Sequence, residues 1–313
     1  MANVFSFVQA QISSRIKSRI YTADNRPKKY AGKYKLNIQE ANDFIYNHLQ
    51  TDSPFMVARY GAVETSIIEW RLAQKLNLLK DFSEGRMYSI TNNAGFFPKE
   101  QDYVVRFADL MLEKSRLVDL FGVFYWNMEE YIIKHFAPQA NLVRARGIEP
   151  WYAEEPWTRG LKGKKVLVIH PFESTILSQY QKREELFLNE QILPEFELKT
   201  LKAVQTIAGE KDDRFENWFQ ALDYMYDEAM KKDFDVAIIG CGAYGFPLAA
   251  KLKEAGKQAI HMGGATQYLF GIKSKRADEG NSVIRGLYTD AWVRASNEET
   301  PKNASKVEGG CYW

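Results

Sequence analysis

The chain has 313 residues, 45% of them hydrophobic and 26% charged, so it can bury a substantial core as one large or two modest domains and lacks the composition of a disordered protein. Its formal net charge of +2 is close to neutral, which argues against broad nucleic-acid binding through overall charge. The two cysteines and four scattered histidines form neither a disulfide framework nor a metal-ligand spacing, which favours a reducing, cytoplasmic setting.

The first thirty residues predict an amphipathic basic helix. Apolar residues recur at helical spacing from Val4 to Ile20, while Arg15, Lys17 and Arg19 supply positive charge. Residues 1–36 are therefore expected to form a helix and a linker. Through residues 1–29 this helix would lie on the inner face of the cell membrane, or else dock on its own domain or on a partner subunit. We expect neither a secretory signal nor a membrane span, because no segment approaches about 20 consecutive apolar residues.

Strands and helices alternate over residues 37–313. The predicted strands are 55–58, 87–90, 117–124, 165–170, 197–201, 234–239 and 257–262. The predicted helices are 38–49, 63–76, 102–114, 128–135, 175–188, 213–232 and 246–255. This order predicts an α/β fold with a mainly parallel, Rossmann-like sheet and flanking helices. Two lobes, about 37–160 and 161–313, and one extended sheet are both consistent with the pattern.

A glycine turn with the pattern G-x-G-x-x-G, residues 240–245, joins a predicted strand directly to a predicted helix. Such a turn brings backbone amides at a helix N-terminus close to an anion, and Gly242 leaves room for that approach. A dinucleotide enzyme also needs a carboxylate after the next strand, but that strand ends at His261-Met262-Gly263. We therefore favour a nucleotide or phosphate site over NAD(P) binding, with a purely structural turn as the alternative.

The last 33 residues, 281–313, are polar and loop-like but close with Cys311-Tyr312-Trp313. We expect this aromatic end to pack back onto the body of the protein.

Ligands of open α/β sheets bind beyond the carboxyl ends of the strands, so the residues that follow each predicted strand are the candidate site. These are Arg59, Tyr60, Gly61, Glu64, Asn92, Asn93, His170, Ser174, Thr175, Gly240, Gly242, Tyr244, Gly245, His261, Gly263, Gly264, Thr266 and Gln267, with a basic cluster of Lys273, Lys275 and Arg276 close behind. Structural roles compete with this reading: Ser174 and Thr175 are also suited to cap a helix, and buried histidines are common in cores. We expect Arg59, Glu64, Ser174, Gly242 and Gly263 to converge on one anion-receiving cleft.

Residues 59–64 resemble the Arg-Phe-Gly-Asp-Gly-Glu motif of the GT-D-type glycosyltransferases, enzymes of bacterial surface-polysaccharide and glycoprotein assembly. The Ile-Ile-Gly-x-Gly-Ala-Tyr-Gly turn, the Gly-Gly-Ala-Thr-Gln segment with Phe-Gly-Ile-Lys behind it, and the Glu-Gly-Gly-Cys-Tyr-Trp ending are also similar to a GT-D-like group. The likeness spans residues 55–313, and the combination of motifs in this order is more specific than any one of them.

The resemblance implies a GT-D-like fold, a nucleotide-sugar donor, and a glycan or lipid-linked glycan as acceptor. It places Glu64 and Arg59 near the reacting centre, and the turns and Lys273 near the donor. It also implies a divalent metal, Mn²⁺ or Mg²⁺, but Ala62 stands where the family has the first carboxylate of its pair, so Glu64 is the remaining protein ligand. Without a metal, a helix N-terminus and basic side chains would stabilise the leaving diphosphate.

The leading hypothesis from the sequence is a glycosyltransferase of bacterial polysaccharide or glycoconjugate assembly. The alternatives are a catalytically inert subunit that binds a nucleotide sugar or a partner, consistent with Ala62, and an NAD(P)-linked enzyme.

Overall fold

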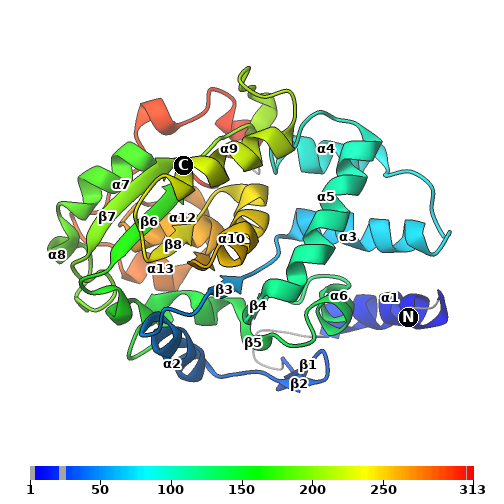
Figure 1. The fold of residues 1–313 in the computed structure, drawn as a ribbon, viewed down its shortest axis with the longest axis horizontal. Helices are drawn as coiled ribbons and strands as arrows, with labels where there is room; N and C mark the ends of the chain where they lie inside the picture. Colours follow the sequence, from blue (N-terminus) through cyan, green and yellow to red (C-terminus); the bar gives the residue numbers. More distant parts are fainter. Residues whose placement is uncertain (1–3, 21–25, 308) are drawn as a thin grey trace.

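A computed structural model describes residues 4–20, 26–307 and 309–313, and it shows one large parallel sheet covered by helices (Figure 1). The seven strands lie in the order β5-β4-β3-β9-β8-β6-β7, and every neighbouring pair is parallel. Their bounds are β3 Phe55–Ala58, β4 Leu120–Val123, β5 Asn141–Arg144, β6 Lys165–His170, β7 Glu197–Lys202, β8 Val236–Ile239 and β9 Gln258–His261. Strands from both halves of the chain thus belong to one sheet, and the predicted α/β class is confirmed. A separate hairpin joins β1 (Lys29–Tyr30) to β2 (Lys33–Tyr34).

Two hydrophobic cores lie on the two faces of this sheet, because alternate residues of each strand point to opposite sides. In β3, Met56 and Ala58 enter one core while Phe55 and Val57 enter the other. The first core is covered by α3 (Ala62–Lys75), α4 (Glu84–Asn92), α5 (Gln101–Lys114), α6 (Glu129–Phe136), α9 (Trp218–Met230) and α10 (Gly245–Glu254). The second is covered by α2 (Ile38–Leu49), α7 (Glu173–Tyr180), α8 (Arg183–Leu186), α11 (Thr266–Leu269), α12 (Lys275–Gly280) and α13 (Ser282–Gly286). Burial on both faces explains why the central strands, such as β3 and β8, are continuous hydrophobic runs, whereas the edge strand β7 is mostly polar.

One predicted strand is wrong, because residues 87–90 lie inside α4. The Ser83 side chain accepts a hydrogen bond from the Arg86 amide and caps this helix, while Met87 and Ile90, three residues apart, bury one helical face. Four residues are too few to distinguish the 3.6-residue period of a helix from the two-residue period of a strand.

Further differences concern lengths and one missed strand. The strand β5 was not predicted, and the predicted helix 175–188 is divided into α7 and α8. The helix predicted to start at residue 213 begins at Trp218, where the side chain of Asn217 accepts hydrogen bonds from the amides of Phe219 and Gln220.

The predicted N-terminal helix is present as α1 (Val4–Ile20) and lies against α6 (Figure 1). Phe7 is fully buried with its ring edge on Tyr131, at 5.6 Å between centroids, and Lys17 pairs with Glu130 at 2.7 Å. Residues 1–3 and 21–25 of the predicted N-terminal unit lie outside the described residues.

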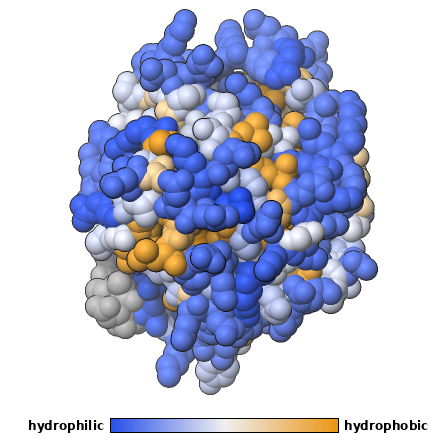
Figure 2. Space-filling model, turned by 90° about the vertical axis from the view of Figure 1, so that its left-hand side faces the viewer, coloured by the Kyte–Doolittle hydropathy of each residue, from blue (hydrophilic) through white to orange (hydrophobic). Residues whose placement is uncertain are grey.

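Within the described part of the chain, no helix has both the length and the apolar character that crossing a bilayer requires. The face shown in Figure 2 is mostly hydrophilic with a few apolar patches, as is usual for a globular surface. The aromatic C-terminus packs onto the body as predicted: the Gln267 side-chain amide donates to the Tyr312 carbonyl at 3.1 Å, and Cys311 is buried.

Candidate functional site

A cleft of about 520 Å³ lies at the carboxyl edge of the sheet. Each of the seven strands contributes to its lining through the residues that follow it: Arg146 after β5, Phe124 after β4, Arg59 after β3, Met262 after β9, Gly242 after β8, Phe172 after β6 and Thr206 after β7. Residues far apart in the sequence meet here because parallel strands all end at the same edge.

Arg59 lies at the centre of the cleft. Its Nε donates to the Met262 carbonyl at 3.1 Å, and its guanidinium lies over the Phe124 ring at 5.0 Å from the centroid. Burial lowers the pKa of Arg59, and the nearby Tyr312, Glu64 and Glu149 oppose that shift. Arg59 is thus a partly buried cation near the charges of Glu64 and Glu149. Partial burial strengthens its electrostatic attraction for an anion.

Gly263 makes room for Arg59. A Cβ atom at residue 263 would lie 1.9 Å from Nη2 of Arg59, and the backbone φ of +62° is in the left-handed region. Only glycine satisfies both conditions without strain.

Glu64 lies in the first turn of α3, where the helix dipole favours a carboxylate. Its carboxylate folds back over Gly61, because a Cβ at residue 61 would lie 2.1 Å from Oε2 of Glu64. Both residues line the cleft with Arg59, as expected for residues that follow a strand's carboxyl end.

A second carboxyl group in the cleft, Glu149, was not predicted. It lies between the short 3-10 turns Ala145–Ile148 and Pro150–Tyr152, which follow β5. Burial raises the pKa of Glu149 to about 7, and Arg59 and Arg146 oppose this rise. Glu149 follows the strand β5, which was not predicted; the short apolar run Leu142-Val143 is the sequence signal for that strand.

The predicted glycine turn faces the cleft. Gly242 is exposed with a φ of +59°, and α10 begins three residues later at Gly245. Gly240 packs against the second turn, since a Cβ there would lie 2.7 Å from the Gly263 carbonyl oxygen. The turns after β8 and β9 therefore form one continuous wall, and Gly264 continues it beside the ring of Tyr312.

Two buried histidines belong to the same wall of the cleft. Burial lowers the pKa of His170 to about 3, and burial together with Arg59 lowers the pKa of His261 to about 3. Nδ1 of His170 accepts from the Phe172 amide at 3.0 Å, and the His261 ring fills the space that a Cβ at Gly245 would need. Both line the cleft as neutral imidazoles.

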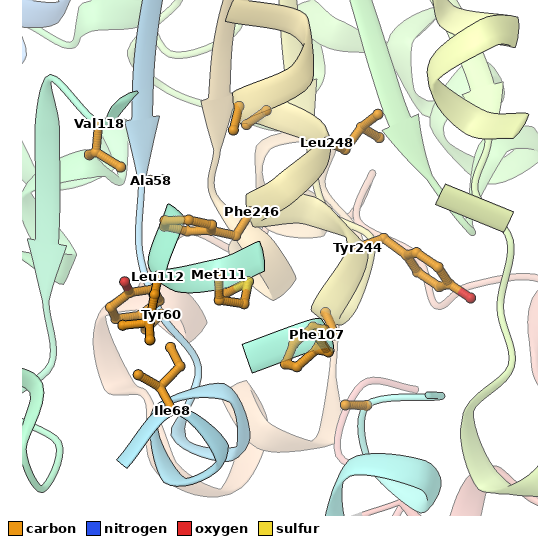
Figure 3. Packing of buried hydrophobic residues seen from close by; sticks show 14 of the residues in the cluster. Ala58, Tyr60, Ile68, Phe107, Met111, Leu112, Val118, Tyr244, Phe246 and Leu248 are labelled. Atoms are coloured by element: carbon orange, nitrogen blue, oxygen red, sulfur yellow. The ribbon is translucent and has the colours of Figure 1, made fainter. Parts of the chain in front are cut away.

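The two candidate tyrosines differ in their relation to the cleft. Tyr60 is fully buried and lies near Phe246 and the α5 residues Met111 and Leu112 (Figure 3). Its ring also packs against Phe121, and its hydroxyl is hydrogen-bonded to Ser115. The Tyr244 ring is stacked on Trp218, with 4.6 Å between centroids and 7° between planes. Tyr60 is thus a core residue, and Tyr244 lines the cleft from a ring that is fixed by packing.

Ser174 and Thr175 do not line the cleft. The Ser174 amide donates to Oε1 of Glu299 at 2.6 Å, and the Thr175 amide donates to Oε2 of Glu299 at 3.3 Å. The N-terminus of α7 is therefore occupied by the chain's own carboxylate, and the expected convergence holds for Arg59, Glu64, Gly242 and Gly263 but not for Ser174.

The predicted asparagine pair is divided between the cleft and its surroundings. Asn93 lines the cleft, whereas Asn92 at the end of α4 donates to Oδ1 of Asn93 at 2.7 Å and to the Lys306 carbonyl at 3.1 Å. Neither follows a strand, because residues 87–90 are helical.

The remaining candidates lie after β9. Thr266 is fully buried, with its hydroxyl on the Ile239 carbonyl at 3.3 Å, and Gln267 lines the cleft. Lys273 lies outside it, with its ammonium 5.2 Å from the Tyr288 ring centroid, while Arg276 of the same basic cluster lines the cleft.

The residues present do not make a protein-held metal site. Among the described residues, no three or more His, Cys, Asp or Glu side chains are close enough together to hold an ion. Ala62 supplies no ligand, and Glu64 alone is a poor site for Mn²⁺ or Mg²⁺, which need several oxygen ligands. The cleft lining also includes the cationic side chains of Arg59, Arg146 and Arg276.

No protein-family model matches the chain, and no curated protein does. Two solved structures are similar to it. One, in which the highly conserved domain of unknown function 1792 has a distinct glycosyltransferase fold, is 14% identical with a TM-score of 0.44, over 92% of this chain and 96% of that chain. The other, a selenomethionine-substituted structure of domain of unknown function 1792, is 15% identical with a TM-score of 0.43, over 84% and 91%. Similarity of this degree concerns the fold and not the activity.

Proposed function

We propose that the protein is a glycosyltransferase that moves a sugar from a nucleotide-sugar donor to a glycan or lipid-linked glycan in bacterial surface-polysaccharide assembly. The observation that carries the proposal is the meeting of Arg59, Glu64, Gly242 and Gly263 in one cleft, although they come from opposite ends of the chain. The cleft combines what such a donor needs: amides and cations for the diphosphate, and carboxyl groups for hydroxyl protons.

In the proposed reaction, the bond between the sugar's anomeric carbon and the diphosphate breaks as a bond to the acceptor oxygen forms. Arg59 and the amides of the glycine turn stabilise the negative charge that develops on the leaving diphosphate. The acceptor hydroxyl passes its proton to the Glu64 carboxylate. Glu149, whose pKa is about 7, is the second proton acceptor in the cleft.

Isothermal titration of the full chain with UDP-, GDP-, CMP- and TDP-sugars tests donor binding. We expect one donor to bind wild type and the exposed-site control Lys162→Gln equally. Arg59→Gln should weaken that binding by about tenfold or more, because a charge-assisted contact is lost. Silence of the wild-type protein toward every nucleotide sugar would overturn the proposal.

The inert-subunit alternative is favoured by Ala62, which removes one carboxylate that the resembling enzymes have. Turnover separates the two: transfer by the wild type that is lost in Glu64→Gln, with donor binding retained, excludes inertness. An NAD(P)-linked enzyme is disfavoured by the end of β9, which carries His261 and Gly263 where such enzymes place a carboxylate.

We also propose that α1 contacts an anionic membrane surface. Val4, Val8, Ile12 and Ile16 recur every four residues on its outer side, are 37–58% exposed, and flank Phe5, which is 77% exposed. The helix contains no acidic residue, so its charge complements acidic lipid.

Co-sedimentation with vesicles of acidic lipid tests this contact. Ile12→Asp should release the protein, whereas Leu188→Asp should not, because it adds the same charge at an equally apolar but distant exposed residue. Loss of dimers instead of vesicle binding in Ile12→Asp would show that a second copy, not lipid, covers the helix.

A further inference from the structure

Four cations gather beside the cleft, on the side away from the glycine turns. We call Arg26, Lys35, Arg144 and Arg146 the basic pocket. Arg144 ends β5 and Arg146 lies in the turn that follows, while Lys35 is held alongside them because the Leu36 amide donates to the Leu142 carbonyl at 2.8 Å. Segments more than one hundred residues apart thus place their positive charges together.

The charges of the basic pocket are close enough to disturb one another. Burial lowers the pKa of Lys35, and Arg26 and Arg144 lower it further. Burial likewise lowers the pKa of Arg144, with Arg26 and Arg146 adding to the shift. Among the described residues, no carboxylate forms an ion pair with any of the four, and Glu149 is the carboxyl group whose charge acts on Arg146.

The fold holds these cations in place with neutral groups. The Tyr125 ring lies 4.6 Å from the Arg26 guanidinium and 4.9 Å from the Lys35 ammonium, and the Lys35 ammonium donates to the Tyr125 hydroxyl. Nε of Arg26 is buried without a hydrogen-bond partner. Tyr125 is itself fixed at a φ of +68°, with its amide donating to the buried Glu129 carboxylate at 2.6 Å.

Repulsion between neighbouring positive charges raises the free energy of the folded protein, and an anion bound between them relieves it. Three guanidinium groups and one ammonium, with an unused donor among them, suit the several oxygens of a phosphate. Arg146 belongs to both the basic pocket and the cleft lining, where it lies with Trp126, which is 38% exposed. In the sheet, β5 is three strands away from β9, so this pocket is separate from the glycine turns.

We propose that the basic pocket binds the phosphate or diphosphate ester of the acceptor, next to the donor half of the cleft. The role as an acceptor subsite rests on the proposed transferase function; the binding of a phosphate does not. A phosphate ester here would direct its attached sugar toward Trp126 and Glu149.

Titration of the full-length protein with inorganic pyrophosphate tests the site directly. Wild type and Lys162→Gln, a control at the amino edge of the sheet, should bind pyrophosphate equally. Arg144→Gln and Lys35→Gln, neither of which lines the cleft, should each weaken binding by about tenfold or more while circular dichroism shows an unchanged fold. Unchanged affinity in both variants, or no binding to wild type, would overturn the proposal.

A second experiment determines whether the phosphate ester belongs to a lipid or to a soluble acceptor. If the ester belongs to a lipid, vesicles of neutral lipid doped with a polyprenyl phosphate should retain wild type but release Arg144→Gln; if it belongs to a soluble acceptor, only pyrophosphate should distinguish them. Pyrophosphate binding without nucleotide-sugar binding would support the basic pocket and contradict the transferase function. Nucleotide-sugar binding without pyrophosphate binding would support the transferase function and contradict the basic pocket.

Discussion

The N-termini of α7 and α10 follow neighbouring strands, β6 and β8, and differ in what fills them. At α7 the Glu299 carboxylate accepts from the amides of Ser174 and Thr175, and is 5% exposed. At α10 the preceding turn opens on the cleft through Gly242. The same strand–turn–helix unit thus occurs twice. In β6–α7 the helix N-terminus is occupied by the Glu299 carboxylate, and in β8–α10 the turn before the helix is open to the cleft.

The two carboxyl groups of this region differ in the same way. Glu299 is surrounded by donors, whereas Glu149 is only partly buried, lines the cleft, and has a pKa that burial raises to about 7. A carboxylate with several donors stabilises the fold, whereas a cleft carboxyl with a raised pKa is a candidate for proton transfer. Four predictions test this contrast, from the largest expected effect to the smallest.

Removing the structural anion should cost the most. Glu299→Ala leaves the part-buried Ser174 amide, the buried Thr175 amide and the Thr175 hydroxyl without an acceptor, so we expect the free energy of unfolding to fall by about 2–4 kcal/mol. Urea unfolding measures it, with exposed Glu298→Ala as the control within about 0.5 kcal/mol. Equal losses in the two variants would show that the α7 N-terminus does not depend on this carboxylate.

Neutralising the Glu149 side chain should instead raise the free energy of unfolding at high pH. The folded-state pKa of Glu149 lies above the ordinary value of 4.5, so the stability from its protonated form is present below that value and is lost as pH rises through about 7. Glu149→Gln should therefore be more stable than wild type by about 1–3 kcal/mol near pH 8 and similar to it near pH 4.5. Unfolding curves at both pH values decide it; a variant that is less stable near pH 8 contradicts the assignment.

A methyl group in the open turn should affect binding more than folding. Gly242→Ala puts alanine at a φ of +59° with no atom within 4 Å of its Cβ, so we expect a loss of about 1 kcal/mol in stability and weaker binding of a nucleotide sugar. Gly256→Ala is matched, with a φ of +84° and free space but a position outside the cleft. It should lose similar stability and keep its ligand affinity; the same loss of affinity in both would mean that backbone strain, not the cleft, is responsible.

The smallest effect belongs to Ser174. Its side chain is exposed and outside the cleft, so Ser174→Ala should change the free energy of unfolding by less than about 0.5 kcal/mol and leave nucleotide-sugar titrations unchanged. A clear loss of affinity would show that the α7 N-terminus reaches the ligand despite Glu299.

Much of the fold could be read from the chain because burial on both faces makes parallel strands into unmistakable apolar runs, such as Phe55–Ala58 and Lys165–His170. The errors fell where that signal is weak. Residues 87–90 are too few to separate helix from strand, and β5 is a four-residue edge strand with one exposed end. The missed strand concealed Glu149 and Arg146, so the cleft was predicted without one of its walls.

The sequence alone determined the glycine turn, the Arg59 to Glu64 segment and the rule that both lie at a strand's carboxyl end, since these depend on local backbone chemistry. The sequence did not show which distant residue each of these side chains or amides contacts. Only the tertiary structure decided that Glu299, more than one hundred residues away, fills the α7 N-terminus, that Tyr60 turns into the core, and that the charges of Arg26 and Arg144 act on each other. Such pairings depend on which strands are neighbours, and the order of strands in a sheet is set by long-range packing rather than by any local pattern.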